Sequence, residues 1–240
     1  MRISSTDMQN NFGKYLKFAE ANEEIIVTRN GKDVAKLSAF AGGNDTILRE
    51  EAAGYKASDW VTYEEFLELI EASEQRFELI DGVVYNLASP SYKHQHTVHE
   101  LHGTLYSWFK GKPCTPLTSP FDITLEKEKT NICVVQPDLV IICDKDQIDA
   151  QGKYRGTPDL VVEVLSPSTR SKDLIWKLDL YRKCGVKEYW IVDPIKEQVA
   201  VYTLTDGEIA DMTYYSNTGE QYAESQLFKG LRISTQDLFA

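Results

Sequence analysis

The distribution of apolar residues predicts a β-sheet core in the C-terminal part of the chain. Segments 134–143, 159–166 and 188–194 are dominated by Val, Ile, Leu and aromatic residues. Such nearly continuous runs are typical of central strands that are buried on both faces of a sheet. We expect one more strand at 121–125, and we expect 198–204 to pair with 188–194 or to lie at the sheet edge.

Helical patterns surround these strands. Thr62 and Glu65 form a capping box, so a helix should begin there, and Asp81-Gly82 should turn a hairpin. A long helix is predicted to follow Ser91, and another to begin near Ser166 with Leu174, Leu178 and Tyr181 on its buried face. A last strand and a short helix should close the chain. The fold class is therefore α/β (α+β): a mixed sheet flanked by helices.

Residues 1–40 form a pattern of their own. A helix should bury one stripe, and Asn30-Gly31 should join two short strands in a tight hairpin; the stripe consists of Met8, Phe12, Tyr15, Leu16 and Ala19. So short a module buries little surface, and we expect it to dimerise or to pack on the rest. Residues 41–58 have the composition of a linker, which leaves 59–240 as the main domain.

Charge separates the two parts further. The whole chain carries a net charge of −11, but residues 1–40 hold six Lys and Arg against five Asp and Glu. The remaining residues hold 20 bases against 32 acids. An acidic surface argues against broad, non-specific binding of nucleic acid. Because no apolar run approaches a membrane span or the core of a signal peptide, we expect a cytoplasmic protein without membrane contact.

The four cysteines show no paired spacing. Cys114, Cys133, Cys143 and Cys184 lie mostly in apolar surroundings and lack the CxxC pattern of a zinc site. We expect them to be reduced, buried thiols rather than zinc ligands or disulfides.

Two acids in the strand segments are the candidates for chemistry. Glu163 stands inside an apolar strand, where a carboxylate is costly unless it is paired or binds a metal. Asp138 leads the preceding apolar run, although an acid after a proline can also simply cap a turn. Lys177 falls on the buried face of the following helix beside Tyr181, whereas Lys172 falls on the opposite side.

Glu78 and the histidines leave alternatives open. Glu78 alternates with apolar residues in its strand and could face the solvent or the site. All four histidines lie in the first half of one helix: His94, His96, His99 and His102. They lack the i, i+4 pair of a helical zinc motif. We favour a polar helix face with one histidine near the site over a histidine-rich metal centre. His94 is a secondary candidate for that histidine.

The N-terminal segment resembles the Phd/YefM antitoxin family. The resemblance rests on the two serines, the Asn-Phe pair and the IIVTRNGK hairpin, and covers residues 3 to about 40. It implies dimerisation and DNA binding through Arg2, Ser4, Ser5, Thr6 and Asn10. Antitoxins of this type continue into a toxin-binding tail, whereas this chain continues into a folded domain. A dimerisation module without repressor activity is the alternative.

Residues 62–239 resemble the Uma-type endonuclease family of the PD-(D/E)xK, restriction-endonuclease-like superfamily. The matching segments include FELIDGVV, QPDLVII, GTPDLVVEVLSPSTR and EYWIVDP. The resemblance implies that Asp138 and Glu163, with the Val164 carbonyl, bind Mg²⁺ or Mn²⁺ and that Glu78 assists. The motif lysine should stand at 165, where this chain has Leu165. The resemblance therefore implies a relocated lysine, Lys177 first and Lys172 second.

These features predict a Mg²⁺-dependent DNA endonuclease that forms a homodimer or a higher homo-oligomer. The alternatives are a non-catalytic DNA-binding regulator and a toxin–antitoxin-like fusion whose first module restrains the second. If Lys177 is the relocated lysine, its ammonium should lie within a few ångströms of Glu163.

Overall fold

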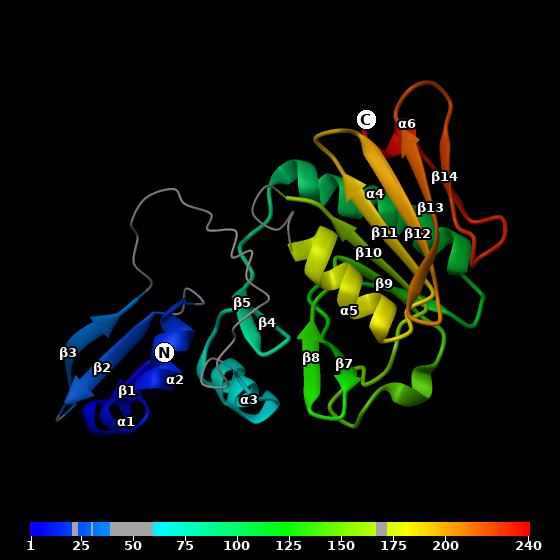
Figure 1. Cartoon of the computed structure of the whole chain (residues 1–240). Helices are drawn as coiled ribbons and strands as arrows, with labels where there is room; N and C mark the ends of the chain where they lie inside the picture. Colours follow the sequence, from blue (N-terminus) through cyan, green and yellow to red (C-terminus); the bar gives the residue numbers. More distant parts are fainter. Residues whose placement is uncertain (21–23, 30, 39–59, 167–171) are drawn as a thin grey trace. The chain divides into compact units, whose positions relative to one another are not determined.

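A computed structural model describes residues 1–20, 24–29, 31–38, 60–166 and 172–240 (Figure 1). These residues divide into two compact units, 1–88 with 131–133, and 89–130 with 134–240. The predicted linker at 41–58 lies outside the described residues.

The first unit begins with a small three-stranded sheet of order β1-β2-β3. Strand β1 runs parallel to β2, and β2 pairs with β3 as an antiparallel hairpin. The elements are β1 (Arg2–Ser4), α1 (Ser5–Asn10), α2 (Phe12–Glu20), β2 (Ile25–Arg29) and β3 (Lys32–Leu37). Gly31 has a φ of +74°, as the predicted hairpin turn requires, and Asn30 lies outside the described residues.

The apolar stripe expected for the first helix is only partly buried. The helix is interrupted at Asn11 and restarts as α2, so the apolar positions do not stay on one side. Tyr15 and Ala19 are buried, whereas Phe12 and Leu16 are 52% and 40% exposed. The expectation that Phe12 and Leu16 belong to the buried stripe was therefore wrong within this chain.

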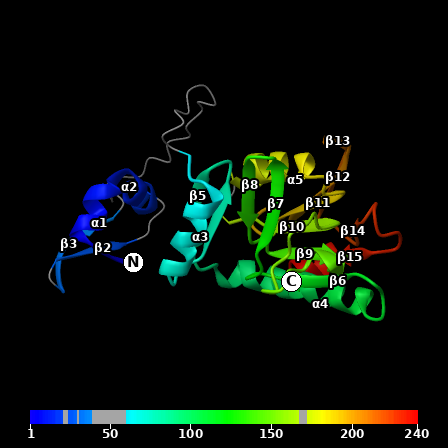
Figure 2. The ribbon, with the colours of Figure 1, turned by 90° about the horizontal axis from the view of Figure 1, so that it is seen from below.

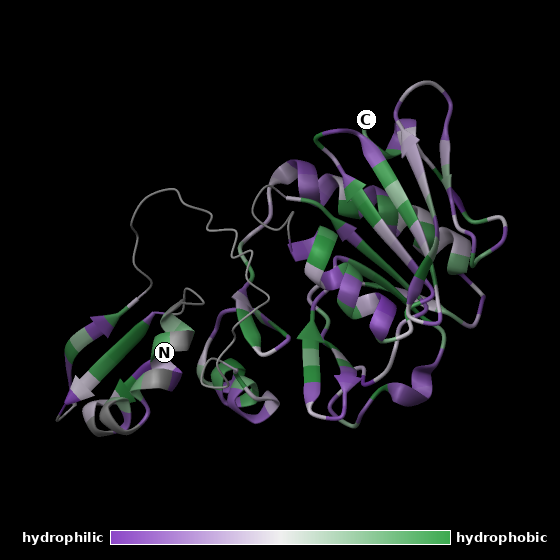
Figure 3. Ribbon diagram, in the orientation of Figure 1, coloured by the Kyte–Doolittle hydropathy of each residue, from purple (hydrophilic) through white to green (hydrophobic). Residues whose placement is uncertain are grey.

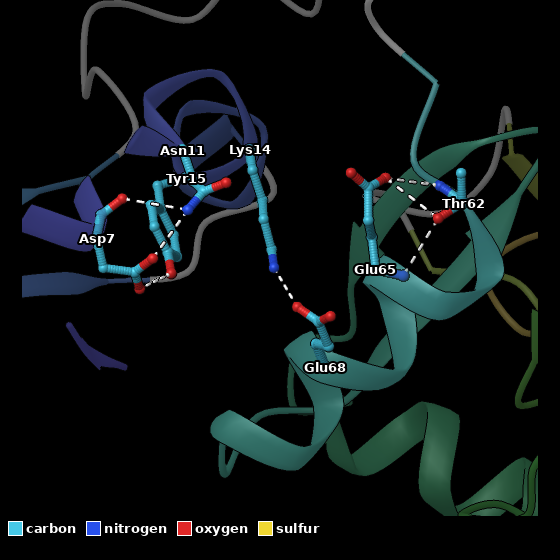
Figure 4. A network of polar contacts seen from close by, with 7 residues as sticks. All are labelled: Asp7, Asn11, Lys14, Tyr15, Thr62, Glu65 and Glu68. Carbon is cyan, nitrogen blue, oxygen red and sulfur yellow. Dashed lines mark hydrogen bonds and ion pairs between the residues drawn. The ribbon is translucent and has the colours of Figure 1, made fainter. Parts of the chain in front are cut away.

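The rest of the first unit confirms two local predictions. Thr62 and Glu65 cap α3 reciprocally, and Asp81 and Gly82 both have the positive φ of a tight hairpin turn. The elements are α3 (Tyr63–Ala72), β4 (Phe77–Ile80), β5 (Val83–Asn86) and the first three residues of β8 (Asn131–Val135). An ion pair joins Lys14 of α2 to Glu68 of α3 (Figure 4).

The second unit is built on a six-stranded mixed sheet of order β13-β12-β11-β10-β9-β6. Only β10 and β11 run parallel, and the other neighbours are antiparallel. The strands are β6 (Thr115–Thr118), β9 (Leu139–Ile142), β10 (Leu160–Val164), β11 (Glu188–Asp193), β12 (Gln198–Thr205) and β13 (Glu208–Ser216). Every residue of β9, β10 and β11 is buried, as the apolar runs predicted. The run 134–143 is not one strand, however, because Gln136 to Asp138 separate the end of β8 from β9. Figure 3 shows hydrophobic residues along these strands.

Helices cover both faces of this sheet, which confirms the predicted fold class (Figure 2). Alternate residues of β10 pack with α4 and the C-terminal segment, and α5 lies on the opposite face. The remaining elements are α4 (Tyr92–Phe109), β7 (Ile123–Glu128), the short turn η2 (Lys145–Gln147), the π-helical segment η3 (Lys172–Lys177), α5 (Leu178–Lys183), β14 (Tyr222–Glu224), β15 (Arg232–Ser234) and α6 (Thr235–Leu238). The described residues contain no helix that is long and apolar enough to cross a membrane.

The far edge of the sheet differs from the prediction. Strand β12 pairs with β11, as expected, but it is not an edge strand because β13 pairs with its other side. Sequence patterning missed β13. Most of its residues are exposed, so the strand has no continuous apolar run.

The expectation that all four cysteines are free thiols was wrong. Cys114 and Cys143 form a disulfide, whereas Cys133 and Cys184 remain thiols. The physical reason is the antiparallel register of β6 and β9, in which Thr115 faces Ile142. One residue further along this register, the two cysteines stand opposite each other with Cα atoms 4.0 Å apart. They are 29 residues apart in sequence, and spacing alone does not reveal this pairing.

Candidate active site

Strand register brings the two candidate acids together. Strands β9 and β10 are antiparallel, and Leu139 faces Val162. Asp138 directly precedes Leu139 and Glu163 directly follows Val162, so both acids lie at the same end of this strand pair, although 25 residues separate them in sequence. The Val164 amide donates a hydrogen bond of 2.8 Å to Asp138 Oδ2, so Asp138 also ties the two strands together.

Glu163 faces the helix that follows its strand. Its neighbours Val162 and Val164 point into the core beneath α4, and the alternation of a strand therefore directs Glu163 to the other face. There Glu163 Oε1 accepts hydrogen bonds from Lys177 Nζ at 2.7 Å and from the Tyr181 hydroxyl at 2.9 Å. The predicted contact between the Lys177 ammonium and Glu163 is thus present.

A second carboxylate lies beside Lys177. Asp173 Oδ1 is 3.7 Å from Lys177 Nζ, and the two residues are four positions apart. The side chains of Glu163, Asp173 and Lys177 are 4%, 2% and 3% exposed. A buried charge requires a partner of opposite sign, so each of these groups depends on the others.

One histidine of α4 reaches this region. Ser91 caps α4, which places His94 in the first turn, and His94 Nε2 lies 3.3 Å from Asp138 Oδ2. Burial lowers the pKa of His94. The hydrogen bond and the negative charge of Asp138 raise it, as does the Val164 main chain, and the net effect is a raised pKa. Hence His94, and not the more exposed His96, His99 or His102, is the histidine at the site.

The remaining candidates lie elsewhere or make other contacts. Lys172 is half-exposed at the first residue of η3, and Glu78 is fully buried in β4 of the first unit, opposite Tyr85. Arg2 pairs with Asp33, and the Ser4 hydroxyl caps α1 by accepting from the Asp7 amide. Ser5 is the half-buried first residue of α1, and the side chains of Thr6 and Asn10 lie outside the described ones.

Sequence reasoning missed Asp173 as a site residue and gave Tyr181 only a place on the buried face. Asp173, Lys177 and Tyr181 are spaced four residues apart, which places them along one side of the η3–α5 helix. That spacing was the available signal. An acid four residues before a lysine is also common on solvent-exposed helix surfaces, so the spacing alone does not single out Asp173.

Comparison with known families defines the class of protein: the Uma2 family, described as "Putative restriction endonuclease", matches residues 63–236. Because this match covers well over half of the chain, the protein belongs to the Uma2 family. Residues 1–41 match the Phd/YefM antitoxin family of type II toxin–antitoxin systems.

Two individual relatives support the same classification. An uncharacterized protein of Synechocystis is 26% identical over 178 residues, which cover 70% of this chain and 91% of the relative. The crystal structure of a putative nuclease from Anabaena variabilis has a TM-score of 0.60 and 21% identity, covering 75% of this chain and 97% of that one. This structural likeness shows that the fold is shared.

Restriction-endonuclease-like nucleases generally use divalent metals, and the donor chemistry here suits one. Within the described residues, no group of three His, Cys, Asp or Glu side chains forms a metal centre. Magnesium, however, needs only one or two carboxylates and keeps several waters. Asp138 and Glu163 supply two carboxylates.

The contact between His94 and Asp138 predicts a pH-dependent stability. A histidine with a raised folded-state pKa stabilises the fold fully below its unfolded pKa, about 6.5, and loses this effect as the pH rises through the folded value. In metal-free protein, the Tm of wild type minus that of His94→Gln should therefore be larger at about pH 5.5 than at about pH 9. His99→Gln, on the exposed face of α4, is the control. A difference independent of pH would contradict this assignment.

Proposed function

We propose that this protein is a divalent-metal-dependent DNA endonuclease whose site is formed by Asp138, Glu163 and Lys177. The observation that carries the proposal is the buried 2.7 Å contact between Lys177 Nζ and Glu163 Oε1. Leu165, at the motif position, has no ammonium group. Lys177 supplies one from the next helix instead of from the same strand. The proposed site would combine two acids and a lysine from three separate segments.

Asp138 and Glu163 would hold the metal, with the Val164 carbonyl as a further oxygen donor. Bound Mg²⁺ or Mn²⁺ supplies the charge that activates water and neutralises a phosphodiester in the transition state. Lys177 is proposed to stabilise the negative charge that develops on the phosphate, since a pre-oriented ammonium is most effective in a buried site. Tyr181 orients Glu163 by donating to Oε1. The assisting role of Glu78 stays a prediction from the resemblance.

The N-terminal module is proposed to dimerise the protein or to direct it to DNA, as its match to antitoxins supports. Arg2 is exposed, and its side chain pairs with Asp33 at the surface. An exposed ion pair contributes little stability, so Arg2 could exchange Asp33 for a DNA phosphate at small cost. Operator-like DNA binding by the isolated segment 1–58 would test this part of the proposal.

Cleavage of supercoiled DNA tests the main proposal. We expect nicking with Mg²⁺ or Mn²⁺, none with EDTA, and a loss of about 10³-fold or more for Glu163→Gln, because a ligand carboxylate and the lysine's partner are lost together. Glu188→Gln is the matched control. Glu188 is an equally buried strand acid, but it accepts from Trp190 Nε1 and the amides of Gln226 and Leu227.

The control variant should lose stability and keep metal-dependent cleavage. If folded wild-type protein cleaves no DNA with any divalent metal, the endonuclease proposal is wrong. A non-catalytic DNA-binding regulator then becomes the better description, and DNA affinity without cleavage would support it.

A further inference from the structure

Asp173 is a buried carboxylate that the proposed reaction does not use. Its side chain is 2% exposed, and Oδ1 lies 3.7 Å from Lys177 Nζ. That distance exceeds the 2.7 Å between Lys177 Nζ and Glu163 Oε1. Lys177 therefore stands between two carboxylates and makes its shorter contact with the one assigned to the metal.

The fold fixes Asp173 independently of Glu163. The Tyr189 hydroxyl of β11 donates a 3.0 Å hydrogen bond to the Asp173 main-chain oxygen, which fastens the first turn of η3 to the sheet. Burial, first of all, raises the pKa of Tyr189 well above its usual value of 10, so this donor stays protonated. Asp173 and Lys177 are four residues apart on the same helical segment, and they stay adjacent whatever Glu163 binds.

Metal binding changes the balance between the two contacts. A divalent cation on Glu163 would draw that carboxylate's charge away from Lys177 and repel the ammonium directly. Without another anion, Lys177 would then lose its anchor and could turn away from the site. Asp173 is the anion in position to prevent this.

We propose that Asp173 is a positioning residue that holds Lys177 in the site while Glu163 binds the metal. This inference rests on the proposed function for its purpose. The anchoring itself is a property of the folded chain, and it can be measured without metal or DNA.

Trace acetylation of lysines in the full-length protein, quantified by mass spectrometry, measures the anchoring. Glu163→Gln imitates the loss of the Glu163 charge. In this variant Lys177 should react no more than about threefold faster than in wild type, because a buried amine reacts only after local opening. In Glu163→Gln/Asp173→Asn, Lys177 should react at least about tenfold faster and approach the rate of half-exposed Lys172.

Lys127 reports on folding in the same experiment. Its side chain is 6% exposed and pairs with Asp179 at 2.9 Å, so it stays protected as long as the second unit is folded. If Glu163→Gln alone releases Lys177 as fully as the double variant does, Asp173 is not the anchor. Asp173 is likewise not the anchor if Lys177 stays protected in the double variant while Lys127 is protected too.

A double-mutant cycle in Mn²⁺-dependent cleavage provides the second measurement, which is decisive where the labelled double variant unfolds. Asp173→Asn should lower kcat about 10- to 100-fold with little change in the KM for DNA. In the Lys177→Met background, the same substitution should change kcat by less than about twofold. Equal losses in both backgrounds would overturn the positioning role. If wild type cleaves no DNA, the proposed function fails and the labelling result alone decides on Asp173.

Discussion

Lys177→Met is expected to lower DNA cleavage by about 10³-fold or more, whereas Lys172→Met should stay within about threefold of wild type. Lys177 Nζ contacts Glu163 in a buried site, while Lys172 is half-exposed at the start of the same segment. The two lysines are five residues apart, so the pair compares the same change in the same helix. The readout is the initial nicking rate of supercoiled DNA with Mn²⁺.

The same substitution should also destabilise the fold. Lys177→Met leaves Glu163 and Asp173 buried without their shared ammonium, and removing one partner from a buried ion pair typically costs about 3–5 kcal/mol. Cleavage must therefore be measured well below the unfolding midpoint, with near-UV circular dichroism as the check. If folded Lys177→Met cleaves as fast as wild type, or if Lys172→Met is the inactive variant, the assignment of the relocated lysine is wrong.

Asp138→Asn is expected to abolish cleavage, whereas Asp159→Asn should largely preserve it. The chain repeats Pro-Asp-Leu-Val at 137–140 and 158–161, and each aspartate joins its strand to the neighbouring one. Asp138 Oδ2 accepts from the Val164 amide at 2.8 Å, and Asp159 Oδ2 accepts from the Cys143 amide at 3.2 Å. Asparagine can still accept such a bond, so both variants should fold.

The two aspartates differ in what else lies near them. Asp138 lies at the same end of the β9–β10 pair as Glu163 and contacts His94, whereas Asp159 pairs with Lys187 at the surface. Loss of a metal-ligand charge should cost about 10³-fold or more in cleavage rate for Asp138→Asn. Asp159→Asn should cost less than about threefold, since surface ion pairs contribute little. Mn²⁺ binding, measured by calorimetry, should weaken in Asp138→Asn but not in Asp159→Asn. Equal loss in both variants would indicate a structural role for Asp138.

How much of the site could be predicted from the sequence depends on the length scale of each contact. The buried strands, the reciprocal cap at Thr62 and the position of Lys177 on the inner helix face follow from short-range periodicity, and the structure contains all three. Phe12 and Leu16 show the limit of that reasoning. A break at Asn11 changed the phase of the helix, and no periodic pattern records such a break.

Pairings across the sheet could not be predicted, because register depends on which strands become neighbours. The disulfide between Cys114 and Cys143 needs the antiparallel pairing of β6 with β9. His94 differs from the other histidines of α4 because the fold brings its Nε2 to within 3.3 Å of Asp138, which lies 44 residues further along the chain. The edge strand β13 carries too few buried residues to be recognised.

By itself, the sequence determined that Glu163 must lie in a buried strand, and the resemblance to the endonuclease family implied that the motif lysine is missing at position 165. Hydrophobic periodicity decides burial, and burial makes an unpaired carboxylate costly. Only the tertiary structure decided which groups meet that cost. The packing of η3 and α5 on the face of β10 opposite α4 brings Lys177, Tyr181 and Asp173 close to Glu163. That packing depends on contacts between segments that no local pattern encodes.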